Sequence, residues 1–290
     1  MLTRRPTAPT VRMAMSVLGG ILITACQPAA PTNRVPEPSG SPTARQRPTA
    51  ATDPRLTSQQ RLMALAADIG ATPADDTETL AYTYLHTQSW TRATNVITRT
   101  DLRRWRHDDG SGREVTRQPP NVRGLTHRPN AKERDLFAVA TVHARRCAPG
   151  ELRPYLPDPL PTEPSALTNA LAPRELADEP AYPRMVVHGI VGLTTGQYLN
   201  QEQRAATLRV LANVPHIAYQ GFATDIAGRV GLGFMVTADG STLELVIHPR
   251  TGEVLAAHEQ VAGARPGLFS YVLILERGHT TDTATVLVHP

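Results

Sequence analysis

The fold of this chain is decided by residues 234–258, FMVTADGSTLELVIHPRTGEVLAAH. Apolar and polar residues alternate on both sides of Asp239 and Gly240, and such a dipeptide between alternating runs is a strong signal for a tight β-hairpin. A second turn follows at 249–252, and Val254 begins another apolar run. This stretch therefore predicts three consecutive antiparallel strands.

The sheet is expected to continue on both sides of this meander. Residues 217–224 should precede it as a strand, and residues 269–276 should close it. In the N-terminal half, Tyr, Trp, Thr and Val enrich residues 80–90 and 95–106, which favours two more strands. A turn at 108–112 leads into a further predicted strand at 114–118.

Two helices carry start signals that can be read directly. Thr57 is a good N-cap for a helix over 57–69, and Gly70 supplies a stop. Asn200 followed by Gln203 resembles a capping box and opens a helix that Pro215 ends. Shorter helices are predicted at 163–171 and at 184–193.

The order of these elements defines the fold class. No alternation of strand with crossover helix repeats along the chain, which argues against a doubly wound parallel sheet. We therefore predict a single α+β domain over residues 56–290, built as a curved antiparallel sheet with helices grouped on one face.

The amino terminus has the layout of a signal peptide. Arg4, Arg5 and Arg12 give it a positive start, and an apolar stretch follows at 13–25. This stretch is shorter than the roughly 20 residues that a spanning helix needs, and no other long apolar stretch exists, which excludes a polytopic membrane protein. A buried core helix that happens to end in cysteine is the alternative.

The residues Ile23, Thr24, Ala25 and Cys26 resemble the lipobox of bacterial lipoproteins. The resemblance implies cleavage between Ala25 and Cys26, a diacylglyceryl group on the Cys26 sulfur, and acyl chains such as palmitate. Two acyl chains anchor a protein stably to a bilayer. Residues 1–25 would then be the signal peptide, and the mature protein would sit on the outer face of the cell membrane.

A proline-rich tract follows the predicted lipidation site. Residues 27–55 contain seven prolines and almost no large apolar side chain, so they cannot build a core. We expect residues 26–55 to be the lipidated cysteine and a disordered, extended tether.

Composition limits the classes of partner. The chain has 290 residues, of which 40% are hydrophobic, with 30 Lys and Arg against 26 Asp and Glu. Because residues 1–25 hold three arginines and no acid, the remainder has a net charge near +1. This balance gives no reason to expect nucleic acid, and nothing in the sequence indicates an oligomeric state.

Motifs for catalysis, metals and cofactors are missing. There is no Gly-x-Ser-x-Gly elbow, no phosphate loop and no pair of histidines at helical i, i+4 spacing. The residues Asp108 to Gly112 lack calcium-loop spacing and favour a hairpin turn instead. Cys147 is the one cysteine besides Cys26, so the mature domain can form no internal disulfide. We predict no metal, no cofactor and no enzymatic activity.

Four aromatic residues on the predicted N-terminal strands are candidate ligand contacts. Tyr82, Tyr84, Trp90 and Trp105 would line a cleft on the concave face of the sheet. The alternative is that they form core or cross-strand packing.

A family resemblance rests on several short strings. They are DLRRW at 101–105, DGSGR at 109–113, LPT at 160–162, the run 204–215, and Asp225, Gly228 and Arg229 before the hairpin at 249–252. Together they resemble a group of actinobacterial exported or membrane-anchored proteins of unknown function, over most of residues 56–276. Members often have an N-terminal membrane helix, which a lipobox replaces here, and some are encoded beside extracytoplasmic-function sigma factors. The order of elements is also similar to the half-barrel of lipoprotein carrier proteins, at the level of fold only.

Three functions follow as expectations. The first is a non-enzymatic binding module for an amphiphilic ligand or a cell-envelope partner protein. The second, implied by the family resemblance, is an envelope sensory or regulatory partner linked to an extracytoplasmic-function sigma factor system. The third is a hydrolase whose site assembles from distant residues.

Overall fold

The described part of the chain is built on a nine-stranded antiparallel sheet, with four longer helices on one face and one five-residue helix on the other. The computed structural model describes residues 51, 53, 55–73, 80–124, 127–263 and 265–287. The predicted signal peptide, Ala25, Cys26 and nearly all of the predicted tether lie outside the described residues. The observed class is α+β, as the sequence predicts.

The C-terminal meander is confirmed strand by strand. Its members are β5 (Ala218–Thr224), β6 (Val230–Ala238), β7 (Ser241–Ile247), β8 (Val254–Val261) and β9 (Gly267–Thr280). Asp239 and Gly240 join β6 to β7 with φ angles of 48° and 66°. Both values are positive, as a tight hairpin turn with the twist of its strands requires.

The N-terminal half supplies the other four strands. They are β1 (Tyr82–Ala93), β2 (Val96–Arg106), β3 (Gly112–Arg117) and β4 (Val142–Cys147). The sequence pattern predicts the first three but not β4. Five of the six residues of β4 are exposed, so this strand has no alternation of buried and exposed side chains to reveal it. The short helix α2 (Ala131–Asp135) is also unpredicted and has no buried residue.

Pairing between β1 and β9 joins the two halves into one sheet. The strand order is β4-β3-β2-β1-β9-β8-β7-β6-β5. The register runs from Tyr82 opposite Thr280 to Thr91 opposite Ser270, with a shift between His86 and Thr87. β9 closes the meander as predicted, is longer than expected, and lies at the centre of the nine-stranded sheet because it also pairs with β1.

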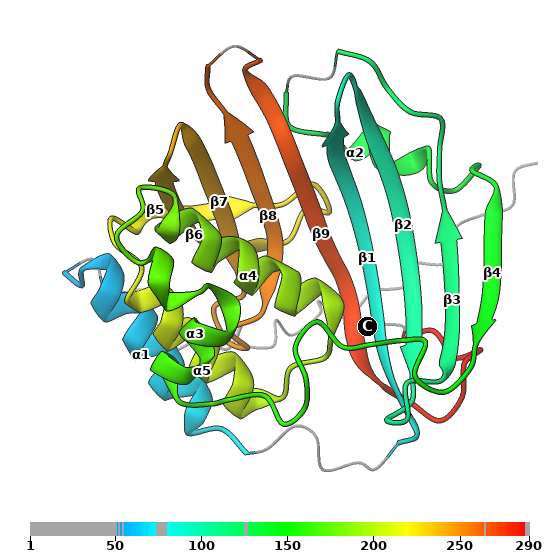
Figure 1. Cartoon of the computed structure of the whole chain (residues 1–290), viewed down its shortest axis with the longest axis horizontal. Helices are drawn as coiled ribbons and strands as arrows, with labels where there is room; N and C mark the ends of the chain where they lie inside the picture. Colours follow the sequence, from blue (N-terminus) through cyan, green and yellow to red (C-terminus); the bar gives the residue numbers. More distant parts are fainter. Residues whose placement is uncertain are drawn as a thin grey trace, which may run out of the picture. The chain divides into compact units, whose positions relative to one another are not determined.

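All four predicted helices are present. They are α1 (Ser58–Gly70), α3 (Pro164–Leu171), α4 (Tyr182–Gly196) and α5 (Gln201–Ala212), with a short 3₁₀ turn η2 (Arg174–Leu176) between α3 and α4. Capping boxes start α1 at Thr57 and α5 at Asn200. Figure 1 shows these helices gathered in front of one half of the sheet, where α4 contacts β6, β7 and β8.

Both faces of the sheet carry buried side chains. On the helix side, Leu232, Phe234 and Leu245 pack against Leu193, Leu208 and other residues of the helices. On the opposite face, a smaller cluster contains Trp90, Tyr271, Leu273 and Phe137, which comes from the connection after α2. Among the described residues, no helix is long and apolar enough to cross a bilayer.

Candidate functional site

The four predicted aromatic residues do not form one cleft. Leu85 belongs to the helix-side cluster, so the alternate residues of β1, including Tyr84 and Trp90, point to the opposite face. Tyr84 and Trp105 lie opposite each other in the ladder, with ring centroids 4.9 Å apart. Tyr82 is partly exposed and its ring contacts His107.

Trp90 sits in a separate cluster from that pair. Its ring centroid lies 5.2 Å from that of Phe137 and 5.7 Å from that of Tyr271. Trp90, Tyr84 and Trp105 are all buried. The structure therefore places these rings among packed side chains on the face opposite the four longer helices, and a ligand-binding role for them stays a prediction.

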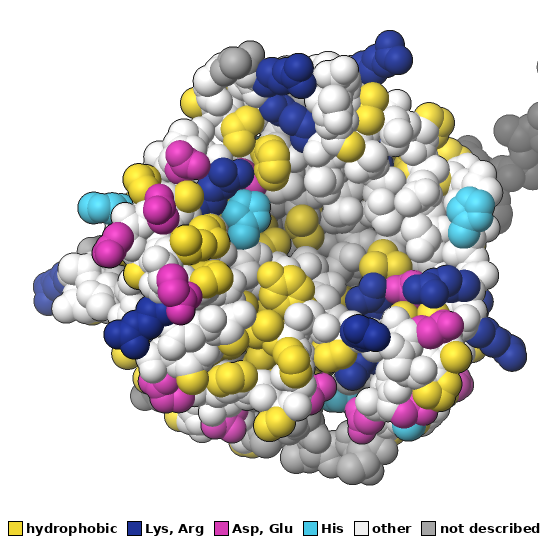
Figure 2. Space-filling view, in the orientation of Figure 1, with side chains coloured by type: hydrophobic (Ala, Val, Ile, Leu, Met, Phe, Trp, Pro, Cys, Tyr) yellow, Lys and Arg dark blue, Asp and Glu magenta, His cyan; other side chains and the backbone are white. Residues whose placement is uncertain are grey.

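The helix-side face is open over β1, β2 and β3, because the helices cover the other half of the sheet (Figure 1). Residues directly opposite each other in a ladder share a face, so the registers give the floor of this open region. Its rows are Ile274–Thr87–Leu102–Thr116, Val272–Ser89–Thr100 and Ser270–Thr91–Thr98. Figure 2 shows a hollow over these strands beside α4. We call this region the open face.

The open face combines hydroxyl groups with aliphatic side chains. Ser89, Thr100 and Leu102 are partly exposed, so they are accessible from the hollow. A hydroxyl can both donate and accept hydrogen bonds, and Leu102 and Val272 add apolar surface. This chemistry suits a ligand with polar and apolar parts.

One rim of the open face is a charged cluster between α4 and β8. Arg184 Nε lies 2.8 Å from Glu259 Oε1, and His188 Nε2 lies 2.9 Å from Glu259 Oε2. Burial alone would raise the pKa of Glu259, but the hydrogen bonds and charges of His188 and Arg184 outweigh it and lower the pKa. The Glu259 carboxylate therefore stays ionised, and half-exposed His188 offers a ring nitrogen at the rim.

The other rim is an arginine–glutamate–arginine row at the far end of β2, β3 and β4. Arg104 Nη2 lies 2.7 Å from Glu114 Oε1, and Arg145 Nε donates to Glu114 Oε2 at 2.8 Å. Burial raises the pKa of Glu114, but the two guanidinium groups dominate and lower it. Arg145 Nη1 also lies 3.9 Å from Glu151 Oε2, so this rim is a row of alternating charges.

A connection between β4 and α3 closes one end of the open face. Arg106 Nε donates to Leu152 O at 2.9 Å, and Leu156 N donates to Gln197 Oε1 at 2.9 Å. The ring of Tyr155 lies against Gly192 of α4, where an added Cβ would come within 2.4 Å of it. Residues 152–156 therefore link the end of β2 to the last turn of α4.

A buried polar network lies on the opposite face. His86 Nε2 is 2.9 Å from Asp101 Oδ2, and Tyr84 Oη donates to Glu276 Oε2 at 2.9 Å. His86 Nδ1 lies 3.5 Å from that same glutamate oxygen. Burial raises the pKa of Tyr84, and the adjacent Glu276 raises it further. Gln88 and Arg134 extend the network toward α2.

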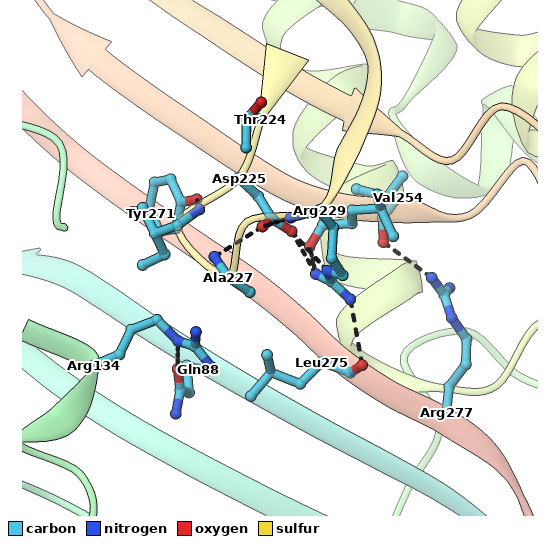
Figure 3. A network of polar contacts seen from close by, with 12 residues as sticks. Gln88, Arg134, Thr224, Asp225, Ala227, Arg229, Val254, Tyr271, Leu275 and Arg277 are labelled. Carbon is cyan, nitrogen blue, oxygen red and sulfur yellow. Dashed lines mark hydrogen bonds and ion pairs between the residues drawn. The ribbon is translucent and has the colours of Figure 1, made fainter. Parts of the chain in front are cut away.

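A second polar group fills the place where β8 and β9 diverge, beyond the Ala256–Leu273 pair (Figure 3). Arg229 donates to the carbonyl oxygens of Leu255 and Leu275, at 3.1 and 3.3 Å. Arg229 Nη2 also lies 2.7 Å from Asp225 Oδ2. These bonds replace part of the ladder that the two strands lack here.

Arg277 completes this bridge between the diverging strands. It donates to Val254 O at 3.0 Å, and its Nε lies 2.9 Å from Glu253 Oε1. Burial lowers the pKa of Arg277 to about 10. A cavity of about 360 Å³ lies alongside. Since Arg229 and Arg277 each have a carboxylate partner within the chain, their evident role is structural.

Groups for metal or nucleophilic chemistry do not gather in the described residues. No set of three or more His, Cys, Asp or Glu side chains there could hold a metal ion. Cys147 is buried, and burial raises the pKa of its thiol, which disfavours the reactive thiolate. The described polar clusters consist of ion pairs and hydrogen bonds within the chain.

Sequence reasoning missed the open face, although a signal for it exists. Thr87, Ser89 and Thr91 are spaced two apart on β1, and Thr98 and Thr100 are spaced two apart on β2. Hydroxyl residues at this period place one polar row on one face of a strand. This spacing predicts a row of hydroxyl groups on one face of the strand, but it cannot show that the helices leave that row uncovered.

Comparison with known proteins finds little. No protein-family model matches the chain, and no curated protein matches it. A solved chain from the MucA/MucB complex of Pseudomonas aeruginosa is similar at 14% identity with a TM-score of 0.29, over 74% of this chain and 54% of that one. A crystal structure of MucB is similar at 12% identity with a TM-score of 0.28, over 75% and 58%. This chain thus spans just over half the length of those solved chains.

Proposed function

We propose that this protein is a non-enzymatic binding module that holds an amphiphilic ligand on the open face. The observation that carries the proposal is that the helices cover only part of one face of the sheet. The uncovered floor consists of partly exposed hydroxyl and aliphatic side chains between two charged rims. An apolar chain would contact Leu102 and Val272, and a polar group would reach the hydroxyl rows or the rim of Arg104, Glu114 and Arg145.

A bulky residue on the floor tests this proposal. Ser89→Trp fills the hollow at its centre, whereas Thr237→Trp adds the same ring at an exposed strand position on the opposite face. Dansyl-undecanoic acid, a fluorescent amphiphile, serves as the probe. We expect it to bind the wild type and Thr237→Trp alike and to lose at least about tenfold in affinity with Ser89→Trp, a change of about 1.4 kcal/mol. Equal affinity for both variants, or no binding to the wild type, would overturn the proposal.

We also propose that the domain is held at the outer face of the cell membrane through Cys26. The support is the lipobox-like sequence Ile23 to Cys26 and the proline-rich tract after it. Cys26→Ala should move the protein from the membrane fraction to the soluble fraction, and only the wild type should incorporate labelled palmitate. Limited proteolysis should cut first within residues 27–55. Unchanged partitioning together with unlabelled wild type would contradict the anchor.

A further inference from the structure

The outer edge of β4 is an unpaired strand edge. β4 pairs with β3 and with no other strand of the described chain. Five of its six residues are exposed. An edge strand presents a row of free backbone N–H and C=O groups that can pair with another extended chain.

Four arginines lie beside this edge on the face opposite the four longer helices. They are Arg103 on β2, Arg113 and Arg117 on β3, and Arg146 on β4, and we call them the arginine patch. Arg113 lies opposite both Trp105 and Arg146, which places all three on the face to which Trp105 points. Within the described part of the chain, none of the four arginines has an acidic partner within ion-pair distance.

Two arginines of the patch face each other across the ladder, which is unfavourable unless an anion lies between them. Arg113 and Arg146 are directly opposite each other in the β3–β4 ladder, and like charges at such positions destabilise a sheet. Arg113 is held in place by Thr283 O at 3.0 Å and by the ring of Trp105. Arg146 is exposed at the edge itself, and no acidic side chain of the described residues lies within ion-pair distance of it. A carboxylate placed there would relieve the repulsion.

On the other side of β4, Arg145 points to the helix-side face. Its side chain is 58% exposed, shares Glu114 with Arg104, and has Glu151 Oε2 at 3.9 Å. A strand added to β4 would therefore meet Arg146 on one face and Arg145 on the other. Exposed apolar residues precede them, namely Leu136, Val139 and Val142, whose exposed fractions are 40%, 83% and 51%.

We propose that β4 is a docking site for an extended acidic segment of a partner protein, which adds to the sheet as a tenth strand. Backbone hydrogen bonds along β4 would supply affinity, and the arginine patch would select acidic side chains. This surface is separate from the open face, so the proposal does not depend on the amphiphilic ligand.

Charge decides against two other occupants. A second copy of this chain would bring another Arg145 and Arg146 to an edge that is already basic. The chain's own tether is unsuited for the same reason, since residues 26–50 contain three arginines and one acid. An acidic segment of another protein matches both the edge and the patch.

The probe for the test is a fluorescein-labelled peptide of alternating glutamate and valine, followed by fluorescence anisotropy. We expect the wild type to bind it and not the matching lysine–valine peptide. The same peptide N-methylated at every backbone nitrogen should fail to bind, because neither of its edges can then donate to a ladder. On binding, amides at 142–147 should gain hydrogen-exchange protection, whereas those of the opposite edge strand β5 should not change.

Charge reversal identifies the selecting residues. Arg146→Glu should weaken binding at least about tenfold, whereas Arg250→Glu, which reverses an exposed arginine in the β7–β8 turn, should not. Failure of the acidic peptide to bind the wild type, or equal binding of its N-methylated form, would overturn the proposal. The proposal would also be overturned if the arginine patch bound phosphatidylglycerol vesicles or polyuridylate while the acidic peptide did not bind. Aggregation of Arg146→Glu with unchanged peptide affinity would show that the arginine only protects the edge.

Discussion

His86 makes the stability of the fold depend on pH. Burial lowers the pKa of this ring, but its hydrogen bonds with Asp101 and Glu276 outweigh burial and raise the pKa above 6.5. Because the folded pKa is the higher one, the protonated ring stabilises the fold fully below the unfolded value. This contribution is lost as the pH rises through the folded pKa.

In His86→Gln, the unfolding free energy should therefore no longer fall as the pH rises above 6.5. We expect the variant to lose about 2 kcal/mol of unfolding free energy near pH 6, since it breaks buried hydrogen bonds to charged groups. Urea unfolding between about pH 6 and pH 9 measures both effects. His143→Gln, at an exposed position on β4, is the control and should keep the wild-type slope. If the unfolding free energy of His86→Gln still falls as the pH rises, a group other than His86 causes the pH dependence.

At Gly252 a larger residue would be both strained in its backbone and crowded by neighbouring side chains. Its φ is +67°, and an added Cβ would lie 2.3 Å from Ile69 Cδ1 and 2.8 Å from Leu208 Cδ1. Gly228 has a similar φ of +84° with open space around it. We expect Gly228→Ala to cost about 1 kcal/mol from backbone strain alone, and Gly252→Ala to cost about 3 kcal/mol because it also overpacks the α1–α5 contact. If urea unfolding shows the same loss of unfolding free energy for both variants, α1 and α5 accommodate the added methyl group without cost.

At the scale of elements, the segment that carries α2 depends on one side chain. Five residues are too few for a helix to be stable by itself. Phe137 packs edge-to-face against Trp90, and Arg134 Nε donates to Gln88 Oε1 at 3.1 Å. These contacts hold α2 and the connection between β3 and β4 on the face opposite the four longer helices.

Phe137→Ala should cost about 3 kcal/mol, because it leaves a cavity beside Trp90. It should also speed hydrogen exchange at 131–140 without affecting α4. Leu136→Ala is the matched control, since this neighbouring side chain is 40% exposed, and its effect should stay near 0.5 kcal/mol or below. If both variants behave alike, Phe137 is not the anchor.

At the scale of the whole described domain, β1 and β9 make the two halves interdependent. The two strands pair over almost their full length, so neither half can keep its sheet when the other unfolds. We predict one cooperative transition in urea, in which the fluorescence of Trp90 and Trp105 in the N-terminal half coincides with far-UV circular dichroism. Separate midpoints for the two signals would show independent halves.

The strength of local signals explains which elements could be predicted. Capping boxes at Thr57 and Asn200 and the turn at Asp239 and Gly240 act within a few residues, so the helices and the C-terminal hairpins follow from them. β4 lacks such signals, because five of its six side chains are exposed and its position is set by β3. α2 does have a capping box, formed by Asn130 and Glu133, but it has no buried residue and therefore no apolar period to mark it as a helix.

The candidate sites depend even more on distant contacts. Thr87, Thr100 and Val272 come from three strands and meet only because β9 pairs with β1. Likewise, Arg113 and Arg146 become neighbours through the β3–β4 register, across a connection that no local pattern predicts. The aromatic residues chosen from sequence were visible as large side chains, but their sequence could not show that three of them are buried.

The sequence by itself determined the class of fold, the main helices and hairpins, and the expectation of an export signal with a lipid-bearing cysteine. Those features follow from hydrophobic period, caps and turn residues, which are short-range. Only the tertiary structure decided that β9 joins the two halves, that the helices leave part of one face open, and that an arginine-rich strand ends the sheet. Each of these depends on which distant strands pair, and pairing is settled by the burial of the whole core.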